Sequence, residues 1–161
     1  MSTAASRAHR ALSAAGATAA TAESLTGGLI GAALTAVPGA SATYRGGIVA
    51  YASDLKSALL GVPGELLARH GAVHPDVALA MAEGARDALG AAFGLAVTGV
   101  AGPEPQDGRE VGTVFCAVAG PGGGARVERL RLTGDRAAIR EQTVEQALHL
   151  LIAEVARTTH K

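Results

Sequence analysis

The two residues of this chain best suited to nucleophilic chemistry are Ser24 and Lys56. Ser24 lies in the glycine-rich run 21–28, Thr-Ala-Glu-Ser-Leu-Thr-Gly-Gly. Of the 14 basic residues, 12 are arginine, and the only lysine besides Lys56 is the last residue, Lys161. Arginine stays charged in proteins, whereas a buried lysine can lose its proton and act as a base. A serine on a glycine-rich turn together with one singular lysine predicts a Ser–Lys nucleophile pair.

Both residues also have other interpretations. Ser24 or Thr26 could cap the helix that follows the turn. Lys56 could be a surface charge, or a permanently charged group that binds a phosphate. As a base, Lys56 would be buried beside the strand ends, where its pKa falls, and Tyr51 could relay or orient the proton. The Gly-x-Ser-x-Gly, Walker and Gly-x-Gly-x-x-Gly patterns are absent from the sequence.

Composition and charge restrict the class of protein. The chain has 161 residues, enough for one domain over residues 1–161 with a substantial core, and 48% of them are hydrophobic. The 14 acidic residues balance the 14 basic ones, which argues against a general nucleic-acid binder. The four aromatic residues other than histidine are too few for a base-stacking surface. We therefore expect no nucleic-acid partner.

Cysteine usage and hydropathy bear on the compartment. Cys116 is the only cysteine, so no internal disulfide can form and a reducing compartment fits. It lies in the apolar run 111–119, where a small buried residue is expected. No stretch approaches the roughly 20 apolar residues of a membrane helix. Arg7, His9 and Arg10 interrupt the amino-terminal region where a secretory signal would be apolar. We expect a cytoplasmic protein without membrane association.

A metal site is not expected. His70 and His74 have the four-residue spacing of metal ligands that share a helix. Gly71 lies between them and Pro75 follows, and both residues interrupt helices. No other pattern in the sequence requires a metal, and we also expect no cofactor.

The elements that must position Ser24 and Lys56 follow from hydrophobic periodicity and turn residues. Helices are predicted at 4–15, 27–36, 53–61, 63–69, 74–89 and 135–157. Strands are predicted at 17–22, 47–51, 93–97, 111–119 and 126–132, with 38–46 as a loop. The last two strands flank a Pro-Gly-Gly-Gly turn and form an antiparallel hairpin. This order predicts an α/β sandwich with a mainly parallel sheet and an antiparallel edge.

Three loops would bring the candidate residues together. Ligands in such folds bind beyond the carboxyl ends of the strands. The loops 24–28, 51–54 and 98–102 each follow a predicted strand, and we expect them to converge. Gly99 and Gly102 would let the backbone approach a ligand closely, or would mark a plain turn.

Two arginines lie at the start of the last helix. Arg136 and Arg140 could reach an anionic ligand in the same region, or could form exposed ion pairs. The sequence alone leaves both interpretations open.

In order along the chain, these runs resemble the CinA C-terminal domain family, which includes stand-alone nicotinamide-mononucleotide amidases. The resemblance extends from about residue 7 to residue 155, so it covers nearly the whole chain. Its ordered set of short runs is specific, although each run alone is modest. The matching runs are 21–28, 37–41, 46–51 with Lys56, 60–62, 70–73, 81–85, 98–103, 111–114 and 134–136.

The resemblance implies a fold and a reaction. The fold is a three-layer α/β/α sandwich with a mixed sheet. The reaction is hydrolysis of the carboxamide of nicotinamide mononucleotide, which gives nicotinate mononucleotide and ammonia. The family's serine, lysine and tyrosine fall on Ser24, Lys56 and Tyr51. Ser24 would attack the amide carbonyl while neutral Lys56 takes its proton, and the protonated lysine would help ammonia leave.

The substrate-binding residues would be of two kinds. Backbone N–H groups would hold the oxyanion near Thr26, Gly27 and Gly28, or near Thr98 and Gly99. The candidates for the ligand phosphate are Arg45, Arg136 and Arg140. Besides this small molecule, we expect a second copy of the chain as a partner, because the last helix is apolar enough to self-associate.

One departure and two alternatives accompany this hypothesis. Many family members have cysteine after the serine, where this chain has Leu25, which matters little if Ser24 is the nucleophile. One alternative is a non-catalytic nucleotide-binding or protein-interaction module linked to competence and DNA damage, the context that named the family. The other is a phosphate sensor that uses a charged Lys56. Arginine at position 56 would be tolerated by a phosphate site but not by a general base.

Overall fold

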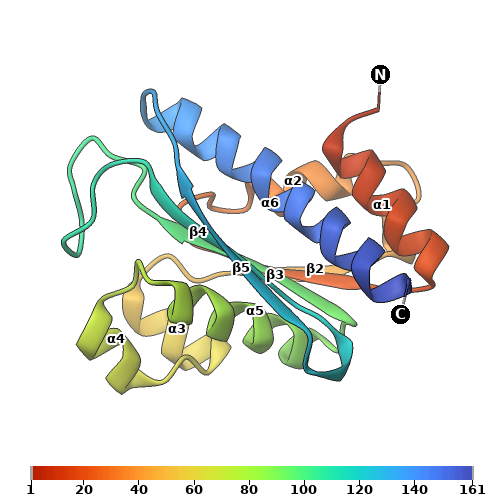
Figure 1. The fold of residues 1–161 in the computed structure, drawn as a ribbon, viewed down its shortest axis with the longest axis horizontal. Coiled ribbons are helices and arrows are strands. Elements are labelled where there is room, and N and C mark those ends of the chain that lie inside the picture. Colours follow the sequence, from red (N-terminus) through yellow and green to blue (C-terminus); the bar gives the residue numbers. More distant parts are fainter. Residues whose placement is uncertain (1, 161) are drawn as a thin grey trace.

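One five-stranded sheet lies between two layers of helices in the structure, a computed structural model that describes residues 2–160 (Figure 1). The helices are α1 (Ala4–Ala15), α2 (Leu29–Thr35), α3 (Ser53–Leu60), α4 (Gly64–His70), α5 (Pro75–Leu89) and α6 (Arg136–Thr159). The strands are β1 (Ala19–Glu23), β2 (Tyr44–Val49), β3 (Phe93–Gly99), β4 (Thr113–Ala119) and β5 (Ala125–Arg131). Two short 3₁₀ turns, η1 (Ala40–Ala42) and η2 (Pro121–Gly123), complete the elements.

The sheet is mixed, as expected. Its strand order is β2-β1-β3-β4-β5. Strand β1 pairs in parallel with β2 and with β3, whereas β4 pairs antiparallel with β3 and with β5. The carboxyl ends of the three parallel strands therefore meet at one edge of the sheet, and this edge carries the residues that follow β1, β2 and β3.

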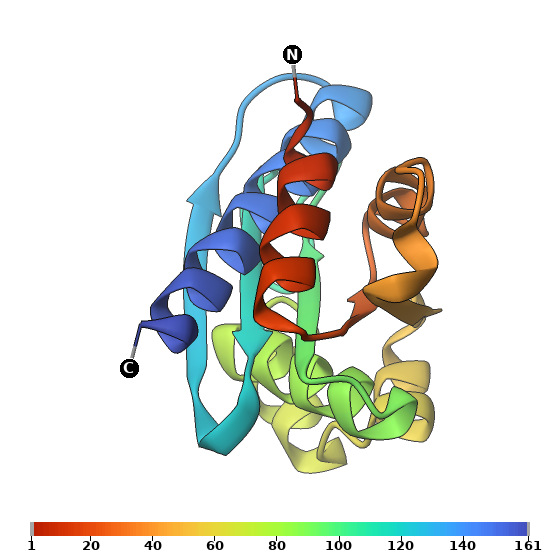
Figure 2. The ribbon, with the colours of Figure 1, turned by 90° about the vertical axis from the view of Figure 1, so that its right-hand side faces the viewer.

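Helices cover both faces of the sheet and confirm the α/β/α sandwich (Figures 1 and 2). Helices α1, α2 and α6 contribute to one apolar core, through residues such as Leu12, Ile30 and Leu148. Helices α3 and α5 contribute to the other core, through residues such as Leu60 and Met81. Strand β3 supplies side chains to both cores, because successive residues of a strand point to opposite faces. This explains why β3 is apolar throughout.

Two glycines let α5 approach its neighbours backbone to backbone. A Cβ atom on Gly94 of β3 would lie 1.9 Å from the carbonyl oxygen of Ala82 in α5. A Cβ atom on Gly84 of α5 would lie 2.0 Å from the carbonyl oxygen of Leu60 at the end of α3. Helix α3, which carries Lys56, is therefore held against the sheet through α5.

Strand β2 differs from its prediction. It spans Tyr44–Val49 rather than 47–51, so part of the segment predicted to be a loop is a strand. The pairing of β1 with β2 shifts register between Ala19 and Ala20, where β2 accommodates one extra residue, Arg45. The consequence for the site is that Tyr51 lies beyond the strand, on the connection to α3.

The apolar face of helix α6 (Arg136–Thr159) packs inside the molecule. The apolar residues of α6, among them Ile139, Leu148 and Leu151, are buried within the molecule. Their burial removes the reason for which self-association was expected from this helix.

Cys116 in β4 is fully buried as predicted, and burial raises the pKa of its thiol to about 12. None of the described helices is both long and apolar enough to cross a membrane.

Candidate active site

Ser24 and Lys56 contact each other directly. Ser24 is the first residue after β1, and Lys56 lies in the middle of α3. The Lys56 Nζ atom is 2.9 Å from the Ser24 Oγ atom. The same nitrogen donates to the carbonyl oxygens of Ala50 at 2.8 Å and Tyr51 at 3.1 Å. Lys56 is only 1% exposed, so the sole internal lysine is one of the most deeply buried side chains.

The surroundings of Lys56 accommodate both of its protonation states. Burial lowers the pKa of the Lys56 amine to about 8, and the negative charge of Asp107 opposes this shift. An ammonium group has three N–H donors, which match the three oxygens around Nζ. A neutral amine has two N–H donors for the two carbonyls and a lone pair that can accept the Ser24 hydroxyl hydrogen. Proton transfer between Ser24 and Lys56 therefore leaves no donor on the nitrogen unpaired.

A tight turn holds Ser24 at the edge of the sheet. Gly27 and Gly28 have φ angles of 56° and 107°, which lie in the left-handed region that favours glycine. The Gly27 N–H donates to the carbonyl of Ser24 at 3.1 Å. This bond closes the turn, so the Gly27 N–H is not free to hold an oxyanion, contrary to one of our expectations.

Glu23 fixes the helix that follows the turn. Its carboxylate accepts hydrogen bonds from the N–H groups of Ile30 at 2.8 Å and Gly31 at 3.0 Å, in the first turn of α2. Glu23 is 2% exposed, so these bonds satisfy a buried charge at a helix N-terminus. Since Glu23 immediately precedes Ser24, its carboxylate links the end of β1, before the nucleophile turn, to the start of α2, after it.

Arg140 holds the turn from the opposite side. Its Nε atom donates to the carbonyl of Leu25 at 2.9 Å, and its terminal nitrogen reaches the carbonyl of Thr26 at 3.4 Å. The guanidinium that was expected to bind a phosphate is thus engaged with the backbone of the turn. The hydroxyl of Thr26 is buried and has no hydrogen-bond partner among residues 2–160.

Two N–H groups of the turn remain available. Within the part of the chain that the structure describes, the N–H groups of Leu25 and Thr26 donate to no acceptor. The amide after a nucleophilic serine is a common oxyanion donor. Gly99, the other expected contributor, lies at the end of β3 against β4, where a Cβ atom would lie 2.8 Å from the carbonyl of Thr113, and it also lines the pocket.

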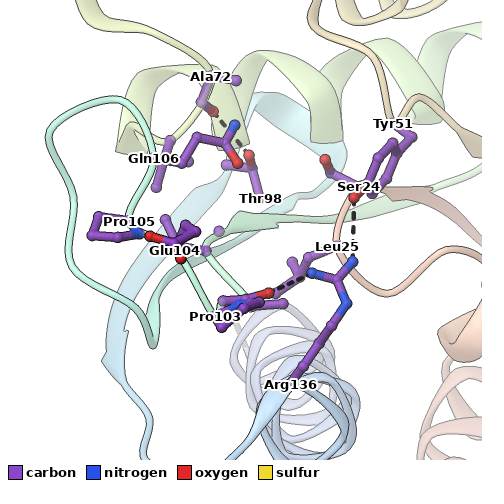
Figure 3. Close-up of a pocket in the computed structure, with 15 residues that line it drawn as sticks. Ser24, Leu25, Tyr51, Ala72, Thr98, Pro103, Glu104, Pro105, Gln106 and Arg136 are labelled. Carbon is purple, nitrogen blue, oxygen red and sulfur yellow. Dashed lines mark hydrogen bonds between the residues drawn. The ribbon is translucent and has the colours of Figure 1, made fainter.

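A pocket opens at Ser24, and the three loops converge there as predicted (Figure 3). Its volume is about 270 Å³. That is slightly below the range of roughly 300–1,000 Å³ typical of small-molecule sites. The pocket is lined by Ser24, Leu25, Tyr51, Ala72, Val73, residues 98–106 and Arg136. A ligand of nucleotide size would therefore fill the pocket with one part and extend out of it with another.

Tyr51 and Arg136 form one wall of the pocket. Arg136 donates to the carbonyl of Gly102 at 2.6 Å and to the Tyr51 hydroxyl at 3.3 Å (Figure 3). The Tyr51 side chain is 61% exposed, and the atom that touches Lys56 is the Tyr51 carbonyl oxygen. The phenol hydroxyl therefore contacts Arg136 rather than the Ser24–Lys56 pair. Arg136 keeps further N–H groups beyond these two bonds, because a guanidinium has five.

The opposite wall depends on Ala72, between α4 and α5. The Thr98 hydroxyl donates to the carbonyl of Ala72 at 2.8 Å. The Asp107 carboxylate accepts a bond from the N–H of Ala72 at 3.0 Å. These two bonds join the end of β3 and the loop after it to the helical layer. They also bring the Asp107 charge close enough to Lys56 to affect its pKa.

Arg45 does not lie with the other candidates. It is near the amino end of β2, whereas the site is at the carboxyl ends of the parallel strands. Its guanidinium donates to the carbonyl of Leu89 at the end of α5, where a cation is favourable. Its expected role as a phosphate ligand in this pocket is therefore wrong.

His70 and His74 lie at the junction of two helices, His70 at the end of α4 and His74 just before α5. As predicted, no helix spans the pair, because α4 ends at His70 and α5 begins at Pro75. The rings of His70 and His74 are stacked with their centroids 3.9 Å apart, and with Asp76 they form a group of candidate ligands. Stacked rings direct their in-plane lone pairs side by side, and the His74 Nδ1 atom already accepts the Asp76 N–H. This geometry does not favour a shared metal.

Comparison with known proteins assigns the family. The family profile described as CinA C-terminal domain matches residues 1–155. The chain belongs to the CinA C-terminal domain family. A CinA-like protein of Myxococcus xanthus is 53% identical over 140 residues, which are 85% of this chain and 33% of that protein. A putative competence-damage inducible protein of Desulforamulus reducens is 52% identical over 136 residues, 84% of this chain and 33% of that protein. The chain spans about a third of the length of the curated relatives it matches.

Solved structures of the CinA superfamily have the same fold. A CinA superfamily protein of Klebsiella pneumoniae is 37% identical, with a TM-score of 0.92 over 96% of both chains. The competence/damage inducible protein CihA of Agrobacterium tumefaciens is 40% identical, with a TM-score of 0.90 over 94% of this chain and 93% of that one.

Sequence reasoning missed two acidic residues of this CinA domain. Glu23 carries the one charge in the strand run 19–23, directly before a short helix, which is a signal that a buried carboxylate caps that helix. Asp107 gave no comparable signal, because its contact with Ala72 depends on how the loop after β3 folds back.

Proposed function

We propose that this CinA domain is an amidase in which Ser24 is the nucleophile and Lys56 is the general base. The observation that carries the proposal is the 2.9 Å contact between the Lys56 amine and the hydroxyl of Ser24, a residue that lines a pocket. The lowered pKa of Lys56, about 8, supports it, because an effective general base titrates near the working pH.

The contacts of Lys56 favour a base over a phosphate-binding cation. A phosphate would need at least one N–H of the ammonium group, and the three are directed at Ser24, Ala50 and Tyr51. With 1% of Lys56 exposed, an anion could reach it only by displacing these partners.

The reaction would have two halves. In the first, the Ser24 oxygen attacks the carboxamide carbon while its proton moves to the Lys56 nitrogen. The N–H groups of Leu25 and Thr26 stabilise the oxyanion. The C–N bond then breaks as Lys56 returns the proton to the leaving nitrogen, and ammonia departs from an ester on Ser24. In the second half, water attacks this ester, Lys56 takes a proton from the water and returns it to Ser24, and a carboxylic acid is released.

The proposed substrate is nicotinamide mononucleotide. The family resemblance suggests it, and the dimensions of the pocket are compatible with it. About 270 Å³ accommodates the pyridine carboxamide beside Ser24. The ribose phosphate would then extend toward the open side, where Arg136 offers N–H groups to an anion.

Ammonia release from nicotinamide mononucleotide tests the proposal. The wild-type chain should release ammonia, and Ser24→Ala and Lys56→Arg should both lose more than about 1,000-fold in kcat. Ser41→Ala, at an exposed serine outside the site, is the matched control and should retain full activity. Circular dichroism verifies folding of every variant.

Two outcomes would contradict the proposal. A well-folded wild-type chain that releases no ammonia would favour a non-catalytic nucleotide-binding or protein-interaction module. An active Lys56→Arg variant would exclude Lys56 as the base, because arginine does not give up its proton at neutral pH.

A further inference from the structure

Two arginines from separate elements lie against the ring of Phe115 in β4. Arg109 belongs to the loop 100–112, which joins β3 to β4 and projects from the end of the sheet (Figure 1). Its Nε atom donates to the carbonyl of Val73 at 3.1 Å, and its guanidinium carbon lies 5.3 Å from the centroid of the ring. The guanidinium carbon of Arg129 in β5 lies 5.8 Å from the same centroid. The ring attracts both cations and holds them close to each other.

A third arginine, Arg131, extends this group along β5. The register of β4 and β5 places Arg129 opposite Phe115 and Arg131 opposite Thr113. Residues two apart in a strand share a face of the sheet. Val127 of the same strand packs on the core to which α5 contributes, so Arg129 and Arg131 lie on that side of the sheet. We call Arg109, Arg129 and Arg131 the arginine cluster.

No carboxylate neutralises the arginine cluster. Within residues 2–160, none of its three guanidinium groups forms an ion pair. Glu110 is the one acidic residue of this range that lines the hollows beside the cluster, and it is not paired with any of the three arginines. Like charges held close together repel each other. A bound anion would relieve this repulsion.

Two adjoining hollows open at the arginine cluster. One has a volume of about 510 Å³ and is lined by residues 108–113, Arg129 and residues 131–133. The other has a volume of about 360 Å³ and lies beside His74 and Phe115. Arg109 and Arg129 line both hollows, and both volumes fall within the range of roughly 300–1,000 Å³ typical of small-molecule sites. Neither hollow shares a lining residue with the pocket at Ser24, so the cluster is a separate site.

We propose that the arginine cluster binds a small molecule through a diphosphate group. Guanidinium groups bind phosphate oxygens through paired hydrogen bonds. One phosphate group carries at most about two negative charges, so three cations match two linked phosphates better than one. The N–H groups of Glu110 and Val111, which also line the larger hollow, donate to no acceptor among residues 2–160 and add two donors. A nucleic acid would need a basic excess that this chain of zero net charge lacks.

Protection of the sheet edge does not by itself account for the cluster. Strand β5 is an edge strand, and charged residues on such a strand prevent it from pairing with another chain. Arg126 and Glu128 supply this protection on the opposite face of β5, where they form an ion pair with an N···O distance of 3.6 Å. Edge protection requires neither Arg109, which comes from another loop, nor the lack of an acidic partner.

Calorimetric titration with inorganic pyrophosphate tests the proposal without any assay of activity. The wild type should bind one pyrophosphate per chain, and inorganic phosphate about tenfold more weakly. Arg129→Gln and Arg131→Gln should each weaken the binding of pyrophosphate about tenfold. Arg126→Gln removes the same charge from the opposite face of the same strand and should bind pyrophosphate like the wild type. ADP distinguishes two sources of the group: tighter binding than pyrophosphate indicates a nucleotide, and equal or weaker binding indicates free diphosphate.

Three results would overturn the proposal. The first is a wild type that binds no pyrophosphate at millimolar concentration. The second is equal weakening by Arg126→Gln and Arg129→Gln, which would mean that only the net charge of the chain matters. The third concerns Arg136, which lines the pocket at Ser24. If Arg136→Gln abolishes binding while Arg131→Gln leaves it intact, pyrophosphate occupies the pocket at Ser24 and not the arginine cluster.

Discussion

Lys56 shows how one residue can be both costly to bury and useful. The neutral amine is the form that accepts a proton from Ser24, and its pKa is lowered to about 8 by burial. We therefore predict that kcat/KM for ammonia release rises about tenfold per pH unit below 8 and levels off above it. Initial rates between pH 6 and 9.5 measure this. A profile that is flat through pH 8 would mean that Lys56 does not act as the base.

The same residue predicts a pH dependence of stability. Because the pKa of Lys56 is about 8 when folded and 10.5 as the ordinary value, both states are protonated below pH 8, and folding must bury an ammonium group. Between pH 8 and 10.5 the unfolded chain binds the extra proton, so this group makes the free energy of unfolding rise with pH. The total rise is about 3 kcal/mol. The buried Cys116 thiol, whose pKa is raised from 9.0 to about 12, has the opposite effect above pH 9. The Lys56 contribution is therefore the difference in the free energy of unfolding between the wild type and Lys56→Met, measured by urea unfolding at several pH values.

For individual residues, some contacts could be predicted from the sequence and others could not. Ser24 and Lys56 were brought together by residue type and by the rule that loops meet at the carboxyl ends of parallel strands. Arg45 was chosen for its charge, and Arg140 for its charge and its place at the start of the last helix. Their real partners are backbone carbonyls, of Leu89 for Arg45 and of Leu25 and Thr26 for Arg140. A carbonyl has no residue-specific signal in a sequence.

At the scale of elements, α6 controls the nucleophile turn through Arg140. Because this guanidinium fixes the carbonyls of Leu25 and Thr26, it also fixes the peptide planes that carry the proposed oxyanion donors. Arg140→Lys replaces a planar guanidinium, which can bond both carbonyls, by a compact ammonium group. It should lower kcat about 100-fold with KM changed less than about twofold. Arg136→Gln should instead raise KM and change kcat little. Steady-state kinetics on both variants decide this, and equal effects on KM would contradict it.

The contact between α5 and β3 leads to a prediction about stability. A methyl group on Gly94 would collide with the carbonyl oxygen of Ala82, and the helix would have to move away from the sheet. Gly94→Ala should therefore destabilise the fold by about 3 kcal/mol, measured by urea unfolding. Gly64→Ala is a suitable control, because a Cβ atom there meets nothing within 4 Å. Equal stability of the two variants would show that α5 tolerates displacement.

The order and type of the elements were predictable from periodicity, whereas one strand boundary was not. Strand β2 contains Gly46 and Gly47 and follows a segment with Pro38 and Gly39, a composition typical of loops. Its first residues are strand because β1 offers a partner, with a shift of register at the start. Such pairing is a property of two segments and cannot be seen in either one alone.

At the scale of the whole molecule, binding of the proposed substrate links to stability. A ligand that binds only the folded chain raises its thermal midpoint. We predict that the Tm of Ser24→Ala, which cannot turn the substrate over, rises by a few degrees in excess nicotinamide mononucleotide. Adding Arg136→Gln should reduce this rise, because Arg136 lines the pocket. Differential scanning calorimetry measures both, and an unchanged Tm of Ser24→Ala would contradict binding of this nucleotide.

The burial of Cys116 makes this chain suitable for site-directed labelling. The reactive form of cysteine is the thiolate, and with a pKa of about 12 and no exposed surface this thiol will not react with maleimides at neutral pH. The wild-type sequence therefore already behaves as a cysteine-free background. A single cysteine introduced at exposed Leu59 would accept one fluorophore or spin label per chain.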